Sequence, residues 1–459
     1  MAALLYALAP SSAAAASADS PFSLQAESSQ QGSESGANGP ADPDSVSPSR
    51  WQFSGQMTNV TQWHPGFPAP YSGALSLDPH RNSAETTDLT LYVGARLWKG
   101  ASVFLAPEID QGFGLDDTAG AAGFLSGEAY KIGANAPYLR IPRAFIRQVI
   151  NLGGDERNLE ADLLQLPETQ TESNLILTVG KFSVVDVFDT NSYAHDPRND
   201  FLNWSIIDAG GFDYAADSWG FTYGGSAEWS EDWWTLRAGV FDLSTIPNGK
   251  QPDPEFAQYE TDLEFEARHA WFGHPGKFKL LFFSNYGNMG SYADALALGE
   301  ATRATPSVAL VRHFQTRDGA AINFEQEVAD DLGVFARVSA NDGSKETFDF
   351  TDINRSASAG ISVRGASWNR SDDTVGVAIV QNAISRVAQE YFAAGGLGVL
   401  VGDGNLNYGP ERILETYYSL HVLKGVSFSL DYQRIDHPAY NRDRGPVSVY
   451  GVRLHAEIL

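Results

Sequence analysis

Side chains able to bind a polar solute are concentrated in two stretches of the sequence. The stretch 185–215 combines carboxylates, amides, an imidazole, a guanidinium and an indole, and its candidate binding residues are Asp186, Asp189, Asn191, His195, Asp196, Arg198, Asn203 and Trp204. The stretch 109–138 follows Glu108 and Asp110 and continues the same chemistry. Such groups exchange hydrogen bonds with a ligand, while an aromatic ring covers its apolar side. The pattern favours reversible binding.

The sequence contains no recognisable catalytic motif. Gly396-Leu397-Gly398 with Gly402 misses the spacing of a dinucleotide-binding loop, and Gly180-Lys181 lacks the upstream glycine of a phosphate loop. The chain has no cysteine, which excludes thiolate catalysis and disulfides. With 57 acidic residues, pairs of carboxylates arise by chance, so no glycosidase pair can be assigned. We therefore predict no enzyme activity, no cofactor and no metal site.

Length and charge narrow the class of protein. A net charge of -26 excludes a nucleic-acid partner, which would require a basic surface. The acid excess either serves solubility or marks acidic loops around a pore mouth. A chain of 459 residues is long for one domain, but a barrel grows by adding strands around a ring.

The first residues suggest export. Residues 1–18 are apolar and end in Ala16-Ser17-Ala18, which resembles a signal-peptide cleavage site. The alternative is an alanine-rich tail. Residues 19–49 have the composition of a disordered linker, and a barrel domain is expected over 50–459. No later apolar run reaches about 18 residues, so no transmembrane helix is expected.

From residue 51 onward the sequence alternates between apolar and polar side chains. Residues 259–268 place Leu263 and Phe265 on one face, with Asp262, Glu264 and Glu266 on the other. A period of two predicts strands. A face rich in charge suits the wet lumen of a membrane barrel, whose apolar face meets lipid. The predicted fold is all-β, a transmembrane antiparallel up-and-down barrel with long extracellular loops partly folded into the lumen.

Connection lengths support this fold. Short turns such as 273–276 alternate with long loops such as 185–215, as between the two ends of an outer-membrane barrel. The stretch 152–172 breaks the rule and is interpreted as a small periplasmic helix. If 307–328 is one strand, sixteen strands result, and both termini face the periplasm. The expected strands are 51–62, 87–98, 102–109, 139–151, 173–184, 217–229, 233–242, 258–270, 277–287, 307–328, 333–341, 355–367, 373–385, 411–423, 426–436 and 447–458.

The positions of the tryptophans also favour a membrane barrel. Six of the ten tryptophans adjoin the short turns: Trp98, Trp229, Trp233, Trp234, Trp271 and Trp368. Indole rings prefer the interface between membrane and water. The placement predicts an aromatic girdle at the periplasmic rim.

From residue 51 to the end, the sequence resembles the OprB-type carbohydrate-selective porins. The resemblance rests on Ser126-Gly127-Glu128-Ala129-Tyr130, on Phe188-Asp189-Thr190-Asn191-Ser192-Tyr193-Ala194-His195-Asp196-Pro197-Arg198 and on Tyr440-Asn441-Arg442-Asp443-Arg444-Gly445-Pro446-Val447. It implies a sixteen-stranded outer-membrane barrel of a Gram-negative bacterium, sugar permeation and a homotrimer. Lipid, lipopolysaccharide and the barrel-assembly machinery are the other expected partners.

For a sugar channel, the stretch 185–215 is predicted to fold inward and narrow the pore, because Phe188, Phe201 and Ile206 make it too apolar for a free loop. Arg143 and Arg147 are four residues apart and share one face of a strand. Further arginines are expected on polar faces: Arg96, Arg237, Arg337, Arg364 and Arg453. These arginines either create a transverse field opposite the acidic loops or neutralise neighbouring carboxylates.

Two other functions stay open at this point. A general or cation-preferring diffusion porin would explain the acid excess. A secreted or periplasmic carbohydrate-binding β-protein would explain the alternation without a membrane.

Overall fold

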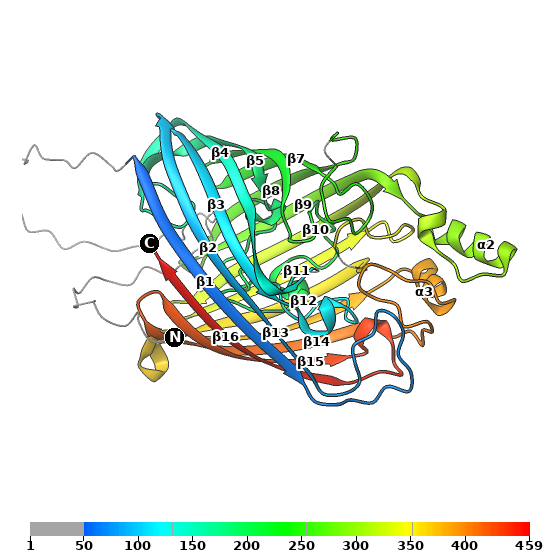
Figure 1. The fold of residues 1–459 in the computed structure, drawn as a ribbon. Coiled ribbons are helices and arrows are strands. Elements are labelled where there is room, and N and C mark those ends of the chain that lie inside the picture. The colour runs from blue at the N-terminus through cyan, green and yellow to red at the C-terminus, as the bar shows by residue number, and fades with distance from the viewer. Residues whose placement is uncertain (1–49, 131, 254, 351) are drawn as a thin grey trace, which may run out of the picture.

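In a computed structural model, which describes residues 50–459 except 131, 254 and 351, sixteen strands form one closed antiparallel barrel (Figure 1). The predicted segments 1–18 and 19–49 lie outside the described residues. The ring closes where β1 pairs with β16. The strands are β1 Trp51–His64, β2 Asn82–Trp98, β3 Ala101–Gly112, β4 Ala134–Leu159, β5 Glu168–Phe182, β6 Thr222–Glu231, β7 Trp234–Asp242, β8 Tyr259–Trp271, β9 His274–Met289, β10 His313–Ala329, β11 Leu332–Asn341, β12 Arg355–Gly365, β13 Arg370–Ala383, β14 Glu411–Leu423, β15 Val426–Asp436 and β16 Val447–Ile458.

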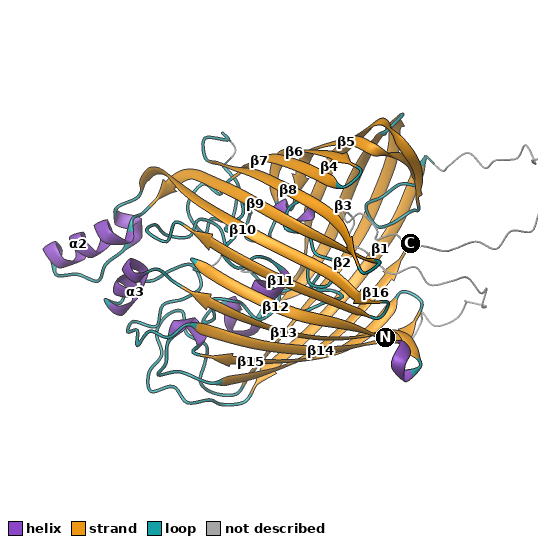
Figure 2. Cartoon of the chain, turned by 180° about the vertical axis from the view of Figure 1, so that it is seen from behind, coloured by secondary structure: helices purple, strands orange, loops and turns teal. Residues whose placement is uncertain are grey.

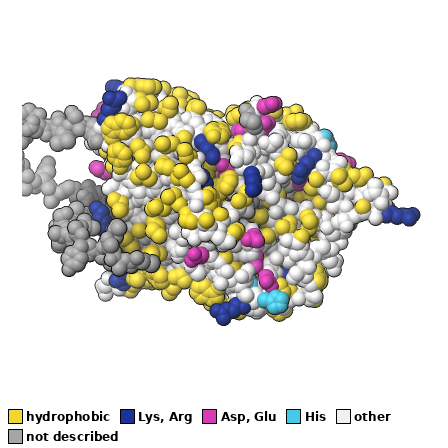
Figure 3. Space-filling view, viewed as in Figure 1, with side chains coloured by type: hydrophobic (Ala, Val, Ile, Leu, Met, Phe, Trp, Pro, Cys, Tyr) yellow, Lys and Arg dark blue, Asp and Glu magenta, His cyan; other side chains and the backbone are white. Residues whose placement is uncertain are grey.

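Alternation along each strand separates a polar lumen from an apolar exterior. On β16, Arg453 and His455 are 1 % and 3 % exposed inside the barrel, whereas Leu454 between them is 45 % exposed outside. Apolar side chains cover much of the outer face of the strands (Figure 3). A closed barrel with an apolar exterior and a charged interior is built for a membrane. This architecture does not suit the soluble β-protein considered above.

The two ends of the barrel differ. Both ends of the described chain lie at the end with short turns, while helices α2 (Tyr292–Thr302) and α3 (Arg386–Ala393) lie beyond the opposite end (Figures 1 and 2). Gly100 has φ +74° in the turn between β2 and β3, a conformation that favours glycine. Within the described ranges, no helix has both the length and the apolar character needed to cross a membrane.

The predicted tryptophan girdle is present at the short-turn end. Trp98, Trp229, Trp233 and Trp271 flank the turns and are 45–60 % exposed on the outer surface. Their rings lie where the strands leave the apolar band, as expected for indoles at a membrane interface.

Two predicted elements were wrong. The stretch 152–172 is not a helix, because β4 and β5 continue their ladder as far as Leu159 and Glu168. Its tip also buries Leu164 and Leu166. The strand predicted over 307–328 begins only at His313, which pairs with Met289, the last residue of β9. Without a partner strand, Val308–Leu310 form a short 3-10 helix instead.

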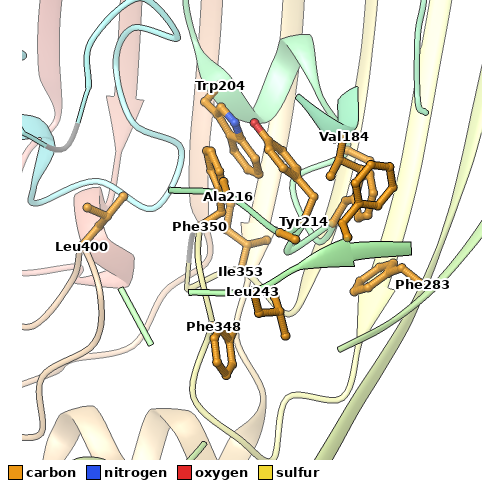
Figure 4. Packing of buried hydrophobic residues seen from close by; sticks show 14 of the residues in the cluster. Val184, Trp204, Tyr214, Ala216, Leu243, Phe283, Phe348, Phe350, Ile353 and Leu400 are labelled. Carbon is orange, nitrogen blue, oxygen red and sulfur yellow. The ribbon is translucent and has the colours of Figure 1, made fainter. Parts of the chain in front are cut away.

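Long connections fold back into the barrel and form a hydrophobic core there. Residues 201–217, which include the short helix α1 (Trp204–Ile207), are buried throughout. Figure 4 shows Trp204, Tyr214 and Phe350 packed together, with Phe348 and Leu400 nearby. The sequence-based prediction that 185–215 enters the lumen is consistent with this arrangement.

Candidate functional site

The loop 185–215 is held in the lumen by side chains of the barrel wall that bind its backbone. Arg337 of β11 donates to the carbonyl oxygens of Asp189 (3.1 Å), Ala194 (2.8 Å) and Ile206 (2.9 Å). It also forms an ion pair with the Asp189 carboxylate at 3.2 Å. Because arginine presents several donors in a fixed plane, one side chain holds the loop at three points.

Two further wall residues hold the same loop. Glu415 of β14 accepts from the backbone N–H of Leu202 and, at 3.0 Å, from that of Asn203. Arg453 of β16 donates to the carbonyl oxygens of Pro197, Asn199 and Asp200. The contacts made by Arg337, Glu415 and Arg453 are called the backbone grip below.

Between the loop and the strands β1, β2 and β4 lies a chamber of about 160 Å³. Its lining includes Arg143 of β4 and, from the loop, Asp186, His195, Asp196, Arg198 and Trp204. All six were predicted as candidate binding residues. The chamber is therefore the place where the predicted chemistry comes together.

Charged groups line the chamber as pairs. Arg143 donates two hydrogen bonds to Asp186, at 2.8 and 2.6 Å. Arg198 lies 3.5 Å from Glu128, and His195 Nδ1 lies 3.3 Å from Asp208 Oδ1. Each pair offers a solute both donors and acceptors at little cost in unpaired charge.

Burial and charge act together on the His195–Asp208 pair. Burial alone lowers the pKa of His195, but the nearby Asp208 carboxylate outweighs this effect, so the pKa of His195 is raised. Burial raises the pKa of Asp208, against the influence of His195. The His195 imidazole therefore stays protonated to a higher pH than it would in water.

Aromatic rings form the apolar side of the chamber. The rings of Trp204 and Phe350 are nearly parallel, with centroids 5.2 Å apart, and Tyr214 lies 4.1 Å from Phe350. On the other side, the Arg143 guanidinium lies over the Phe221 ring at 4.8 Å. Flat apolar faces beside hydrogen-bonding groups match the two kinds of surface on a sugar ring.

The other predicted residues lie outside the chamber lining. Asn191 and Asn203 bind other groups of the loop and wall, as do Asp189 and Arg337. Arg147 donates to Gln165 at 2.7 Å and lies over Phe104, and it is not among the residues that line the chamber.

Glu108 and Asp110 are held in a separate ion cluster. Both bind Arg140, which the sequence reasoning missed although it precedes Arg143 by three residues on the same strand. Two roles were left open for the wall arginines, a transverse field or the neutralisation of neighbouring carboxylates. Arg237 pairs with wall glutamates Glu228 and Glu264, and Arg364 is exposed.

Several lining residues were not predicted. Glu128 occurs in one of the family-like stretches, within the second candidate stretch 109–138 that also contains the lining residue Tyr130, and Asp208 and Tyr214 occur in the loop 185–215. Phe350 comes from the loop 342–354, where the two phenylalanines Phe348 and Phe350 on either side of an aspartate were the available signal.

Comparison with known proteins agrees with the geometry. Residues 76–457 match the family model described as "Carbohydrate-selective porin, OprB family". None of the curated proteins matched the chain.

Among solved structures, the high-pH structure of Pseudomonas putida OprB has a TM-score of 0.67 at 14% identity, covering 89% of this chain and 94% of that one. The outer membrane channel DcaP of Acinetobacter baumannii has a TM-score of 0.49 at 10% identity, covering 89% and 97%. At 14% identity the first likeness shows the barrel fold.

Proposed function

Because the chain belongs to the OprB family of carbohydrate-selective porins and is an outer-membrane carbohydrate channel, we propose that the chamber beside the loop 185–215 is its selective constriction. The observation that carries this proposal is the placement of paired Arg143–Asp186 and Arg198–Glu128 opposite Trp204 and its aromatic neighbours. Family and fold are those of passive porins, and we propose that the protein has no enzymatic activity.

Selectivity in this proposal comes from replacing the water that a sugar loses. Hydroxyl groups exchange hydrogen bonds with the Arg143 and Arg198 guanidinium groups and with their carboxylate partners. Because each arginine and its carboxylate partner already neutralise each other, the chamber can bind an uncharged solute, and the solute needs no charge of its own. Weak binding then permits release on the other side.

Liposome swelling with the purified full chain tests this proposal. Glucose is expected to enter faster than a neutral non-sugar solute of the same size. Arg198→Ala combined with Trp204→Ala should remove that preference while leaving entry of the second solute unchanged or faster. The matched control is Arg386→Gln, because Arg386 lies on α3 with a side chain 92% exposed. Equal preference in the double variant and the native protein would refute the chamber's role.

A cation-preferring general porin is the second candidate, favoured by the net charge of -26. It predicts a strongly cation-selective reversal potential and an ionic current that added sugar does not reduce. The chamber itself argues against strong ion preference, because its arginines and carboxylates are paired.

For orientation and partners, we propose that the short-turn end faces the periplasm and that α2 and α3 face outward. Outer-membrane lipid and lipopolysaccharide then surround the apolar band, and the barrel-assembly machinery inserts the chain. We also propose a homotrimer. Protease treatment of intact cells should cut near α2 and α3 and spare the short turns, and crosslinking in membranes should yield a trimer band.

A further inference from the structure

A group of buried oxygen atoms lies on the lumen side of β8 and β9, away from the chamber lining. Glu260 and Asp262 are two residues apart on β8 and therefore share the inner face. Asn285 of β9 lies directly opposite Glu260 in the ladder. The exposed fractions of Glu260, Asp262 and Asn285 are 0%, 4% and 0%.

None of these oxygens has a hydrogen-bond donor among the described residues. Both carboxylate oxygens of Glu260, both of Asp262 and the Asn285 Oδ1 are buried without a partner. The Asn285 Nδ2 donates to the Asp213 carbonyl oxygen at 2.7 Å, which leaves its oxygen free. Five acceptor oxygens thus lie at neighbouring positions of one buried face, and no donor group of the described residues is bonded to them.

The next two carboxylates along the same face of β8 are bound to cationic side chains, which Glu260 and Asp262 lack. Glu264 accepts from Arg237 and from the Asp189 N–H, each at 2.8 Å. Glu266 is paired with Arg237 at 3.0 Å and with Lys279 at 3.5 Å. No ion pair formed by the described residues includes Glu260 or Asp262. Half of this carboxylate row is neutralised by protein cations and half is not.

Other acids nearby increase the imbalance. Asp262 is the charge that acts most strongly on Glu260, and Asp213 and Asp349 act on Glu260 with the same sign. Arg317 is bound to the Asp213 carboxylate through Nη1, and its Nε and Nη2 have no hydrogen-bond partner among the described residues. Buried ionised carboxylates are costly unless they are paired or coordinate a metal ion.

We propose that Glu260, Asp262 and Asn285 form an internal Ca²⁺ site. Carboxylate and amide oxygens are the ligands that calcium prefers, and its six to eight positions accept water beside protein oxygens. A site without nitrogen or sulfur ligands is poorly suited to zinc. The cation would replace the hydrogen bonds and the positive charge that this half of the row lacks.

The proposed calcium site is linked by hydrogen bonds to the loop that carries Phe350, which gives it a structural role. Asn285 binds the segment that carries Asp213, and Asp213 accepts from the backbone N–H groups of Phe348, Asp349 and Phe350 at 2.7, 3.1 and 2.8 Å. Phe350 in turn lines the chamber. A bound cation therefore stabilises the wall to which one aromatic side of the chamber is attached.

Metal content and terbium luminescence of the detergent-purified full chain test the proposal. After dialysis against metal-free buffer, we expect about one Ca²⁺ per chain by mass spectrometry. Protein refolded with Tb³⁺, which replaces Ca²⁺ on oxygen ligands, should emit when its aromatic residues are excited. The double variant Glu260→Gln with Asp262→Asn should lose both signals.

Two control variants separate this site from other acids. Glu325→Gln removes a buried lumen carboxylate that already accepts from Ser192 N and Oγ at 2.8 and 2.9 Å, and it should keep both signals. Glu327→Gln alters the rim group of His274, Glu327 and Asp330, whose potential ligand atoms lie within 4.8 Å of one another, and it should also leave the signals unchanged.

Three results would overturn the proposal: no bound metal in the native chain, equal signals in the double variant, or loss only in Glu327→Gln. The first result, together with stability that depends on pH and not on Ca²⁺, would mean that Glu260 and Asp262 share a proton. Because metal content is measured without any solute flux, this outcome is independent of the channel's sugar selectivity.

Discussion

Replacing Arg337 by methionine should release the loop 185–215 from the barrel wall. Arg337 and Asp189 are each 1% exposed at their side chains, and Arg337 also binds the carbonyl oxygens of Ala194 and Ile206. Methionine keeps much of the volume but provides no donor. The variant therefore leaves a buried carboxylate and several carbonyl groups without their cation.

The size of the effect follows from what remains bound. Removing one partner of a buried ion pair costs about 3–5 kcal/mol. Asp189 keeps hydrogen bonds from Asn323 Nδ2 at 2.7 Å and from the Ala209 N–H at 2.6 Å, so we expect the lower end. A loss of about 3 kcal/mol lowers the ratio of held to released loop roughly a hundredfold.

Single-channel recording in planar bilayers measures this release. Arg337→Met should show larger and fluctuating conductance and a reduced preference for glucose over a size-matched solute. Adding Asp189→Asn should partly restore the native trace, because it removes the uncompensated charge. Arg268→Met is the control, since Arg268 binds backbone carbonyls of Glu231 and Trp234 at the short-turn end. Native conductance from a folded Arg337→Met barrel would refute the reasoning.

Three further predictions concern the loop 185–215 and the segment 65–81. In Gly333→Ala, the added Cβ would lie 2.0 Å from Tyr193 Cε1, so the ring must move; we expect about 1–3 kcal/mol of destabilisation, measured by urea unfolding. Burial raises the pKa of Asp200 to about 6, so the folded state binds its proton more tightly than the unfolded state. Stability should therefore fall as pH rises from about 4 to about 6, and Asp200→Asn should flatten this slope in thermal unfolding; an unchanged slope would contradict it. Arg444 donates to the carbonyl oxygens of Tyr71 and Leu77, so Arg444→Met should make protease cleavage within 65–81 several-fold faster on intact cells, and an unchanged rate would exclude this anchor.

Strand positions could be predicted because the lipid and the lumen impose a strict period of two. Residues such as Leu454 and Arg453 reveal their faces without any knowledge of their neighbours. Where a strand stops depends on its partner, which explains the error at 307–312. The alternation within one segment contains no information about the end of the next strand.

Site residues were harder to predict, because a loop has no period. Composition correctly indicated that 185–215 is too apolar to be free. It could not separate His195, which lines the chamber, from Asn203, which binds Gln433 of the wall at 3.1 Å. The role of Phe350 could not be predicted for another reason. Phe350 contacts Trp204, which lies 146 residues earlier in the chain, and the two meet only after both loops have folded into the lumen.

The backbone grip has a consequence for how this channel can change. Arg337, Glu415 and Arg453 mostly hold carbonyl and N–H groups, which every residue supplies except that proline lacks an N–H. The wall therefore dictates where the loop runs and leaves much of the choice of its side chains open. Substitutions at the chamber-facing positions of 185–215, whether natural or designed, can therefore change the preferred solute while the backbone of the loop keeps its path.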